Sequence, residues 1–194
     1  MDIVLENMAF ADKRHYTLSQ LNQLKVKYTA KPNDAESFND FIPLYIEDGQ
    51  RIGLPKQAWK DLVLFSSKEK DEKVVIVDKR QAIKYSFPKP LLTYREGQRE
   101  FIEKGYAGIT ENGSGGIMVA MGGFGKTICS LFLISKFGLK TVVLLHTESL
   151  LNQWIDRIHL MFGENFRVGI IQQDNFDIEA GIVVATVQTL NARL

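Results

Sequence analysis

Eight consecutive residues carry the clearest chemical signal in the sequence. The run from Ala120 to Thr127 reads Ala-Met-Gly-Gly-Phe-Gly-Lys-Thr and matches the pattern G-x-x-x-x-G-K-[ST], except that Ala120 replaces the first glycine. Such a loop turns backbone N–H groups and a helix N-terminus toward an anion, whereas an ordinary glycine-rich turn is the alternative interpretation. Lys126 would neutralise phosphate charge and the Thr127 hydroxyl would bind Mg²⁺, so both are candidate catalytic residues and Thr127 is the candidate metal ligand.

The glycines of this loop have a geometric role in the prediction. Gly122, Gly123 and Gly125 permit positive φ angles and would let the backbone approach phosphate without a Cβ in the way. Cys129 follows in the first turn of the expected helix, where the helix dipole can lower a thiol pKa and make it reactive. Its apolar neighbours favour a packing role instead.

A phosphate-binding loop must follow a strand and begin a helix, and the surrounding pattern supplies both. We expect a strand at 116–121 and a helix at 126–137 that ends at Gly138 as its C-cap. Downstream, apolar runs alternate with amphipathic segments, which indicates a parallel sheet covered on both faces and an α/β fold. The expected strands are 141–146, 167–172 and 181–185, and the expected helices are 149–162 and 189–194.

The pattern changes near Pro88 and Pro90, which divide the chain into expected domains at 1–90 and 91–194. In the first domain, Thr17 and Gln20 form a capping-box pair that predicts a short helix. Apolar runs predict strands at 41–46, 62–65 and 74–77, a turn at 47–49 and a solvated loop at 66–73. We therefore expect a small β-rich α+β domain.

Composition excludes several classes of protein. The chain has 194 residues, a net charge of +1 and a single cysteine, which rules out a disulfide framework. We expect no membrane span, because no apolar run reaches about 18 residues, and no signal peptide, because the N-terminus lacks a basic segment followed by an apolar one. These two expectations predict a soluble intracellular protein. The near-zero charge means that a nucleic-acid partner must be argued from local motifs.

Four blocks of residues 91–194 resemble, in order, the first RecA-like domain of superfamily 2 helicases of the DEAD/DEAH type. Gln98 matches the Q-type motif, 120–127 motif I, 143–154 motif Ia, and 185–190 the later Thr-x-Gln-x-Leu motif. The Leu-Leu-x-Gln-Trp ending of the third block is typical of the branch containing XPB, the phage UvsW helicase and type III restriction motor subunits. The region is also similar to transcript-release helicases of poxviruses and other large DNA viruses, which would place it in a virus- or phage-infected cell.

The resemblance implies an ATP-dependent nucleic-acid helicase or translocase that uses ATP and Mg²⁺. It assigns nucleotide binding to Gln98, Gly122, Gly123, Phe124, Gly125, Lys126, Thr127 and Ile128. It assigns contact with the nucleic-acid backbone, DNA favoured over RNA, to Thr147, Thr186 and Gln188. Either threonine taken singly has a helix N-cap as its alternative role. The first 90 residues would be an accessory domain that guides nucleic acid or a partner.

The Walker B carboxylates that such a motor needs do not follow residue 186 in this sequence. We therefore expect an amino-terminal part of a longer protein, cut before Walker B, with an incomplete parallel sheet, little hydrolysis of its own and a second RecA-like domain further along the same chain. The alternative is a non-hydrolysing nucleotide-binding regulatory module. A small-molecule kinase is disfavoured, because Arg157, Arg167 and Arg193 are too scattered for a lid.

Overall fold

A computed structural model describes residues 1–31, 41–66, 73–112 and 115–193, and it divides the chain into two compact units. The first unit is Met1–Gln81 and the second is Ala82–Leu194, so the boundary lies ahead of the prolines that the sequence pattern singled out. The cause is a segment before those prolines, in which Tyr85 and Phe87 pack into the core of the second unit. Among the described residues, no helix combines the length and apolar character needed to cross a membrane.

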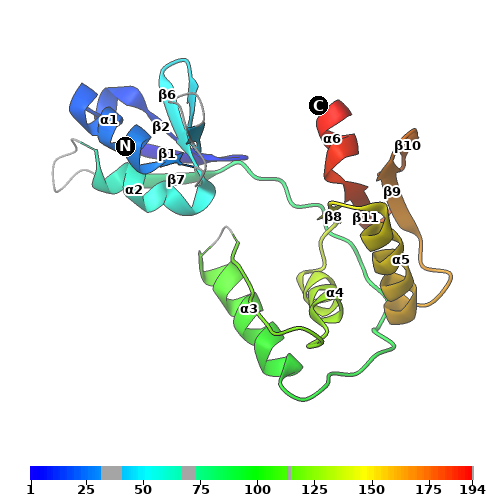
Figure 1. The fold of residues 1–194 in the computed structure, drawn as a ribbon. Coiled ribbons are helices and arrows are strands. Elements are labelled where there is room, and N and C mark those ends of the chain that lie inside the picture. The colour runs from blue at the N-terminus through cyan, green and yellow to red at the C-terminus, as the bar shows by residue number, and fades with distance from the viewer. Residues whose placement is uncertain (32–40, 67–72, 113–114, 194) are drawn as a thin grey trace. The chain divides into compact units, whose positions relative to one another are not determined.

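The first unit is a five-stranded sheet with helices packed against it (Figure 1). Strands β1 and β7 are parallel, and the other neighbouring pairs are antiparallel. The sheet order is β5-β6-β2-β1-β7, and its strands are β1 (Asp2–Leu5), β2 (Ala9–Asp12), β5 (Ile46–Asp48), β6 (Arg51–Leu54) and β7 (Val75–Asp78). The remaining elements are η1 (Lys13–His15), α1 (Leu18–Lys27), β3 (Thr29–Ala30), β4 (Ile42–Pro43), η3 (Lys56–Ala58) and α2 (Trp59–Leu64).

Local sequence signals explain where α1 and the β5–β6 hairpin lie. The predicted capping box is confirmed: the Thr17 side chain accepts a hydrogen bond from Gln20 N at 3.3 Å, and the Gln20 side chain accepts one from Thr17 N at 2.7 Å. Gly49 adopts a φ of +53° in the turn between the two strands. The predicted strand at 74–77 is confirmed as β7, shifted by one residue.

The strand predicted at 62–65 is wrong, because residues 62–64 belong to α2 and Phe65 is its C-cap. Leu62 is fully buried and Leu64 is 75% exposed. A short apolar run cannot be assigned to helix or strand from its pattern alone, and packing of one helical face decided the outcome here. The run at 41–46 is divided between β4 and the start of β5. Residues 67–72 of the predicted loop lie outside the described residues.

The second unit contains the predicted parallel sheet, which confirms its α/β class. Its order is β10-β9-β11-β8, in which β9, β11 and β8 are parallel and β10 is antiparallel to β9. The strands are β8 (Thr141–Leu145), β9 (Val168–Gln172), β10 (Asn175–Phe176) and β11 (Ile182–Thr186). The helices are α3 (Gln98–Asn112), α4 (Lys126–Phe137), α5 (Glu148–Phe162) and α6 (Val187–Arg193). Figure 1 shows α4 beside α5, and α6 leading away from the carboxyl end of β11.

Strand β11 is buried on both faces, as its continuous apolar sequence predicts. Ile182 and Val184 pack in the cluster that includes α4 and α5, whereas Val183 and Ala185 pack in a smaller cluster with Leu190 of α6. Helix α5 contributes a buried stripe of Leu151, Ile158, Met161 and Phe162. Helix α4 ends at Gly138, which has a φ of +61°, so the predicted C-cap is confirmed.

Residues 82–92, which we call the strap, pack against the rest of the second unit before α3 begins. Tyr85 N donates a hydrogen bond to Gly138 O at 2.9 Å, Lys140 N donates to Ile83 O at 2.7 Å, and Leu91 N donates to Met161 O at 2.8 Å. The rings of Tyr85 and Phe87 join those of Phe162 and Phe166, with centroids 4.8 to 6.3 Å apart. The strap is therefore part of the second core.

The strand predicted at 116–121 is wrong. Ile117, Val119 and Met121 are 92, 83 and 78% exposed, and the segment pairs with none of the strands that the structure describes. Apolar composition alone does not make a strand, because a strand also needs a neighbour to satisfy its backbone hydrogen bonds.

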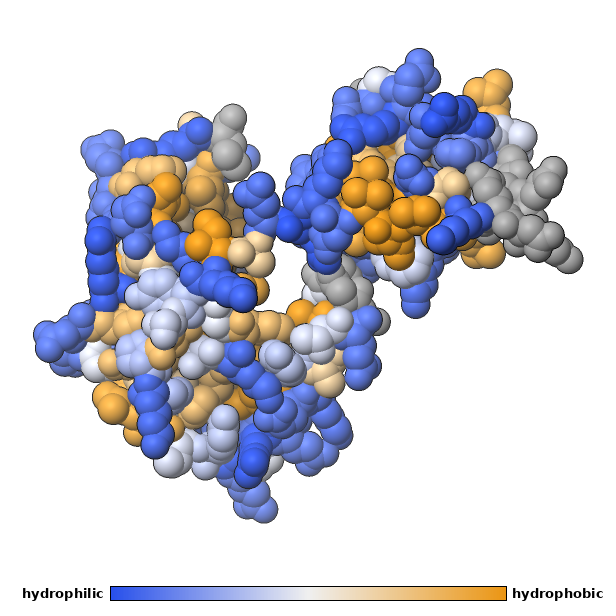
Figure 2. Space-filling view, turned by 180° about the vertical axis from the view of Figure 1, so that it is seen from behind, coloured by the Kyte–Doolittle hydropathy of each residue, from blue (hydrophilic) through white to orange (hydrophobic). Residues whose placement is uncertain are grey.

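Val142 and Leu144 of β8 are also more than half exposed. Figure 2 shows hydrophobic side chains reaching the surface of both units among hydrophilic ones.

Candidate nucleotide-binding site

The glycine-rich loop folds as a tight turn that leads directly into α4. Gly123 and Gly125 have φ angles of +76° and +88°, and Gly125 is the N-cap of the helix. Gly122 does not have a positive φ, so the conformational freedom of glycine is used at only two of the three positions. The turn is closed by a hydrogen bond from Phe124 N to Met121 O, and a four-residue turn of type II needs a positive φ only at its third residue.

The first turn of α4 presents the charged and hydroxyl groups that the sequence pattern predicts. The Lys126 ammonium donates hydrogen bonds to Ala120 O and Met121 O, at 3.1 Å each, so it lies over the loop. Thr127 follows it in the same turn. Since the first N–H groups of a helix lack partners within the helix, this end of α4 provides donors as well as positive charge.

Gln98 connects the segment before α3 to the loop. Its side chain is 2% exposed; Oε1 accepts a hydrogen bond from Arg95 N at 2.9 Å, and Nε2 donates one to Phe124 O at 2.7 Å. The ring of Phe124 in turn packs edge-on against that of Phe101, with centroids 5.1 Å apart. The structure therefore brings Gln98 to the loop, although both ends of its amide are used for contacts with the backbone.

A cavity of about 480 Å³ lies at this loop. It is lined by Leu92, Thr93, Arg95, Gln98, Gly123, Gly125, Lys126, Thr127, Ile128, Gln153, Arg157 and Leu160. Three of these side chains are cationic and none is acidic, so the lining attracts an anion. Gly122 and Phe124, which were predicted to bind nucleotide, are not among the lining residues.

Helix α5 contributes three residues to the lining of the cavity, and the sequence pattern did not predict this role. Gln153, Arg157 and Leu160 are spaced at i, i+4 and i+7, so they follow one stripe of the helix. That spacing was the available signal, but the sequence alone does not show that this stripe faces the loop instead of solvent. Arg157 therefore lines the cavity at the loop together with Arg95 and Lys126.

The predicted nucleic-acid contacts lie at the carboxyl ends of β8 and β11, which pair through Leu145 and Thr186. Thr147 is the N-cap of α5, the alternative considered for it, and its side chain accepts a hydrogen bond from Leu150 N at 3.3 Å. Thr186 is 7% exposed and its hydroxyl donates to that of Thr189 at 2.9 Å. Gln188 Nε2 donates to His146 O at 2.9 Å, joining the two strand ends.

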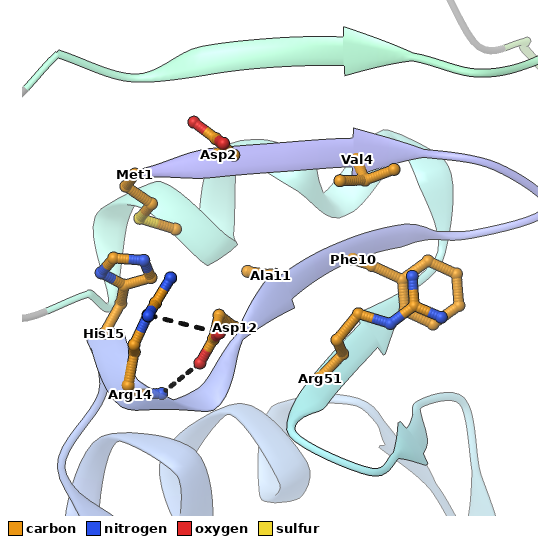
Figure 3. A pocket seen from close by; sticks show the side chains of 9 residues that line it. All are labelled: Met1, Asp2, Val4, Phe10, Ala11, Asp12, Arg14, His15 and Arg51. Carbon is orange, nitrogen blue, oxygen red and sulfur yellow. Dashed lines mark hydrogen bonds and ion pairs between the residues drawn. The ribbon is translucent and has the colours of Figure 1, made fainter.

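A second cavity, of about 310 Å³, lies on the first unit (Figure 3). Here the charges are balanced: Asp12 accepts a hydrogen bond from Arg14 N and pairs with its guanidinium, and Arg51 lies over the Phe10 ring and pairs with Asp48 and Glu6. Because both arginines are already paired and Asp2 and Asp12 also line it, this cavity does not share the anion preference of the loop cavity.

Metal binding at the loop would depend on few protein groups. The described residues contain no cluster of three or more His, Cys, Asp or Glu side chains placed to hold a metal ion. Mg²⁺ commonly takes one or two protein oxygens and completes its shell with phosphate oxygens and water. The residues present therefore fit Mg²⁺ that arrives with a nucleotide, through the hydroxyl of Thr127.

Cys129 is expected to be unreactive in the folded protein. Its side chain is 1% exposed, and burial raises the pKa of the thiol, so the reactive thiolate is depleted at neutral pH. Titration with a chromogenic disulfide reagent at pH 8 should give a slow reaction in buffer and one rapid equivalent in urea. A rapid equivalent in buffer would contradict the packed position.

The glycine-rich loop, the helix that it begins and the parallel sheet together define an α/β unit of the P-loop type, in which none of the described strands leads into the loop. Residues 91–194 match the family described as "Type III restriction enzyme, res subunit", and the chain belongs to this family. The resemblance of this region to superfamily 2 helicases is thereby confirmed.

Two curated relatives agree with this assignment. The chain is 33% identical over 156 residues to a protein of Acanthamoeba polyphaga mimivirus that is designated an ATP-dependent RNA helicase, which covers 78% of this chain and 28% of that protein. It is 35% identical over 119 residues to a protein of Escherichia phage T5 that is designated a helicase, which covers 61% of this chain and 25% of that protein. The chain thus spans about a quarter of the length of each relative.

Proposed function

We propose that this chain carries the ATP-binding part of an ATP-dependent nucleic-acid helicase or translocase. The observation that carries the proposal is the cavity at the loop, where Arg95, Lys126 and Arg157 converge and no acidic side chain is present. A triphosphate matches that charge, and the ATP-dependent designation of the mimivirus relative supports ATP as the energy source.

Each group of the loop has a definite task in this proposal. The N–H groups after Gly125 donate to phosphate oxygens, and Lys126 exchanges its contacts with Ala120 O and Met121 O for the β- and γ-phosphates. Thr127 binds Mg²⁺, which neutralises phosphate charge when bound. Gln98 holds Phe124 O and thereby keeps the loop in place. Hydrolysis would further require carboxylates, which the lining of this cavity lacks.

The strand ends at Thr147, Thr186 and Gln188 are the proposed contact with the nucleic-acid backbone, DNA favoured over RNA. They lie at the carboxyl edge of the parallel sheet, where ligands of such folds bind. The hydroxyl, amide and helix N-terminus gathered there suit phosphate oxygens and read no bases, which is consistent with the small net charge of the chain.

The test is the ATPase activity of the complete protein, measured without nucleic acid and with single-stranded DNA, duplex DNA or single-stranded RNA. Nucleic acid should stimulate the activity, and Lys126→Ala should lower it at least about 100-fold, because a preorganised charge at the reacting phosphate is lost. Lys104→Ala is the matched control, since Lys104 pairs with Glu100 on the exposed side of α3.

Three outcomes separate the alternatives. Stimulation by DNA above that by RNA supports the DNA preference, and the reverse order overturns it. Activity that ignores every nucleic acid overturns the helicase or translocase proposal. Tight Mg-ATP binding without any turnover in the complete protein would instead indicate a nucleotide-binding regulatory module.

A further inference from the structure

We infer that Phe176 and Arg193 form a base-stacking contact for a single strand of nucleic acid. The inference rests on the proposed nucleic-acid contact at the carboxyl edge of the sheet. It adds to that contact two residues that bind the faces of the bases instead of the phosphates. Phe176 lies on β10, Arg193 is the last residue of α6, and the guanidinium carbon of Arg193 lies 5.4 Å from the centroid of the Phe176 ring.

The register of the sheet places Phe176 near the edge at which the parallel strands end. Phe176 pairs with Ile171 of β9, and Ile171 pairs with Ala185 of β11. Ala185 in turn pairs with Leu144 of β8, one residue before the end of that strand. Three spacings between neighbouring strands amount to about 14 Å, or about four nucleotides of a stacked strand. A nucleic-acid strand bound at the end of β8 therefore reaches Phe176 within a few nucleotides.

The ring of Phe176 is accessible to a ligand. It is 50% exposed and lies outside the cluster of buried side chains that Leu190 of α6 packs against. An exposed aromatic ring can stack on any base, because every base has a π face. Arg193 is exposed as well, and a planar guanidinium stacks on bases as it does on aromatic rings.

Hydrogen bonds between α6 and the β9–β10 turn hold Arg193 beside the ring (Figure 1). Gln173 lies in this turn and has a φ of +49°, which is uncommon for a residue with a Cβ. Its N–H donates a hydrogen bond to Thr189 Oγ1 at 3.2 Å, and its carbonyl accepts one from the Arg193 guanidinium. Thr189 also accepts a hydrogen bond from Thr186 at the end of β11, at 2.9 Å. The stacking surface is therefore formed before a ligand arrives, which reduces the entropic cost of binding.

The charges at this turn favour a base over a phosphate. Asp174 follows Gln173 in the turn, and its carboxylate would repel a phosphate group while it offsets the positive charge of Arg193. Stacking on the ring and the guanidinium requires no excess of positive charge. The bases of a duplex are stacked on one another within the helix, so only a single strand can present a base to Phe176.

The experiment measures binding of the complete protein to three labelled DNA probes of equal length by fluorescence anisotropy. The probes are oligothymidylate, an abasic single strand, and the duplex of oligothymidylate with oligoadenylate. Phe176→Ala should weaken binding of oligothymidylate about ten-fold, a typical effect of losing one stacked base. It should leave affinity for the abasic strand and for the duplex unchanged. Phe176→Trp should retain oligothymidylate affinity, because its ring also stacks, and Arg193→Ala should lower it.

Ile178→Ala is the matched control, because Ile178 is 47% exposed two residues after Phe176 and takes no part in the described contacts of Arg193. Phe176→Leu, which keeps an apolar side chain without a ring, should bind oligothymidylate as weakly as Phe176→Ala and provides the comparison if the alanine variant does not fold.

Three results would contradict the inference. Oligothymidylate affinity equal to wild type in Phe176→Ala and Phe176→Leu overturns it and leaves the contact at the strand ends intact. A loss of affinity for the abasic strand as large as the loss for oligothymidylate also overturns it, since Phe176 would then act on the backbone. Absence of binding by all three probes to the wild-type protein would contradict the proposed nucleic-acid contact itself.

Discussion

Gly125→Ala should lower the free energy of unfolding by about 1–3 kcal/mol and weaken Mg-ATP binding at least about ten-fold. Two effects add at this residue. Its φ of +88° is strained for any residue with a Cβ, and an added Cβ would lie 2.7 Å from Gln98 Nε2. Because Gln98 is almost fully buried, its amide cannot move aside without losing the hydrogen bond to Phe124 O.

Gly122→Ala provides the comparison within the same loop. Gly122 has no positive φ, and a Cβ there would meet no atom within 4 Å, so its unfolding free energy should stay within about 0.5 kcal/mol of wild type. Urea unfolding measures both variants, and calorimetric titration measures the affinity of Gly125→Ala. Equal destabilisation of the two variants would argue against the geometry described for the loop.

Gly181→Ala is expected to destabilise the second unit by about 1–3 kcal/mol, and Tyr85→Ala by a similar or larger amount. Gly181 precedes β11, and a Cβ on it would lie 2.3 Å from Tyr85 Cε1 and 2.4 Å from Cζ. The ring cannot retreat easily, because Phe87 and Phe166 lie beside it with centroids at 4.8 and 6.3 Å. The alanine at 181 therefore forces the ring of Tyr85 out of its position.

A double-mutant cycle tests whether that contact is the cause. Once Tyr85→Ala has removed the ring, adding Gly181→Ala should cost less than about 0.5 kcal/mol, so the two changes should be strongly non-additive in urea unfolding. Full additivity would show that Tyr85 does not lie against Gly181.

Elements with strong local signals could be predicted from the sequence. A few neighbouring residues determine the conformation of each of these elements: the glycine-rich loop, α4 with its C-cap at Gly138, α5 and the apolar strands. The same is true of the capping box at Thr17. In these cases the local preference and the tertiary packing agree.

The predictions that failed depend on contacts between distant residues. Leu62 packs into the core from a helix, and the segment at 116–121 has no neighbouring strand in the described part of the chain, but neither fact is visible in a short apolar run. Helix α3, which was not predicted, has two glycines, Gly105 and Gly108, that weaken its helical pattern. Likewise, the stripe of Gln153 and Arg157 is evident in the sequence, but its position beside the loop depends on how α5 packs against β8 and β11.

The strap of residues 82–92 determines where a polypeptide that contains the second unit should begin. Family similarity begins at residue 91, yet a polypeptide that starts there would lack Tyr85 and Phe87 and would leave the rings of Phe162 and Phe166 facing water. It would also lose the backbone hydrogen bonds that join the strap to Gly138 and Lys140. Such a polypeptide should therefore begin at Ala82, because the compact unit extends beyond the residues that match the family.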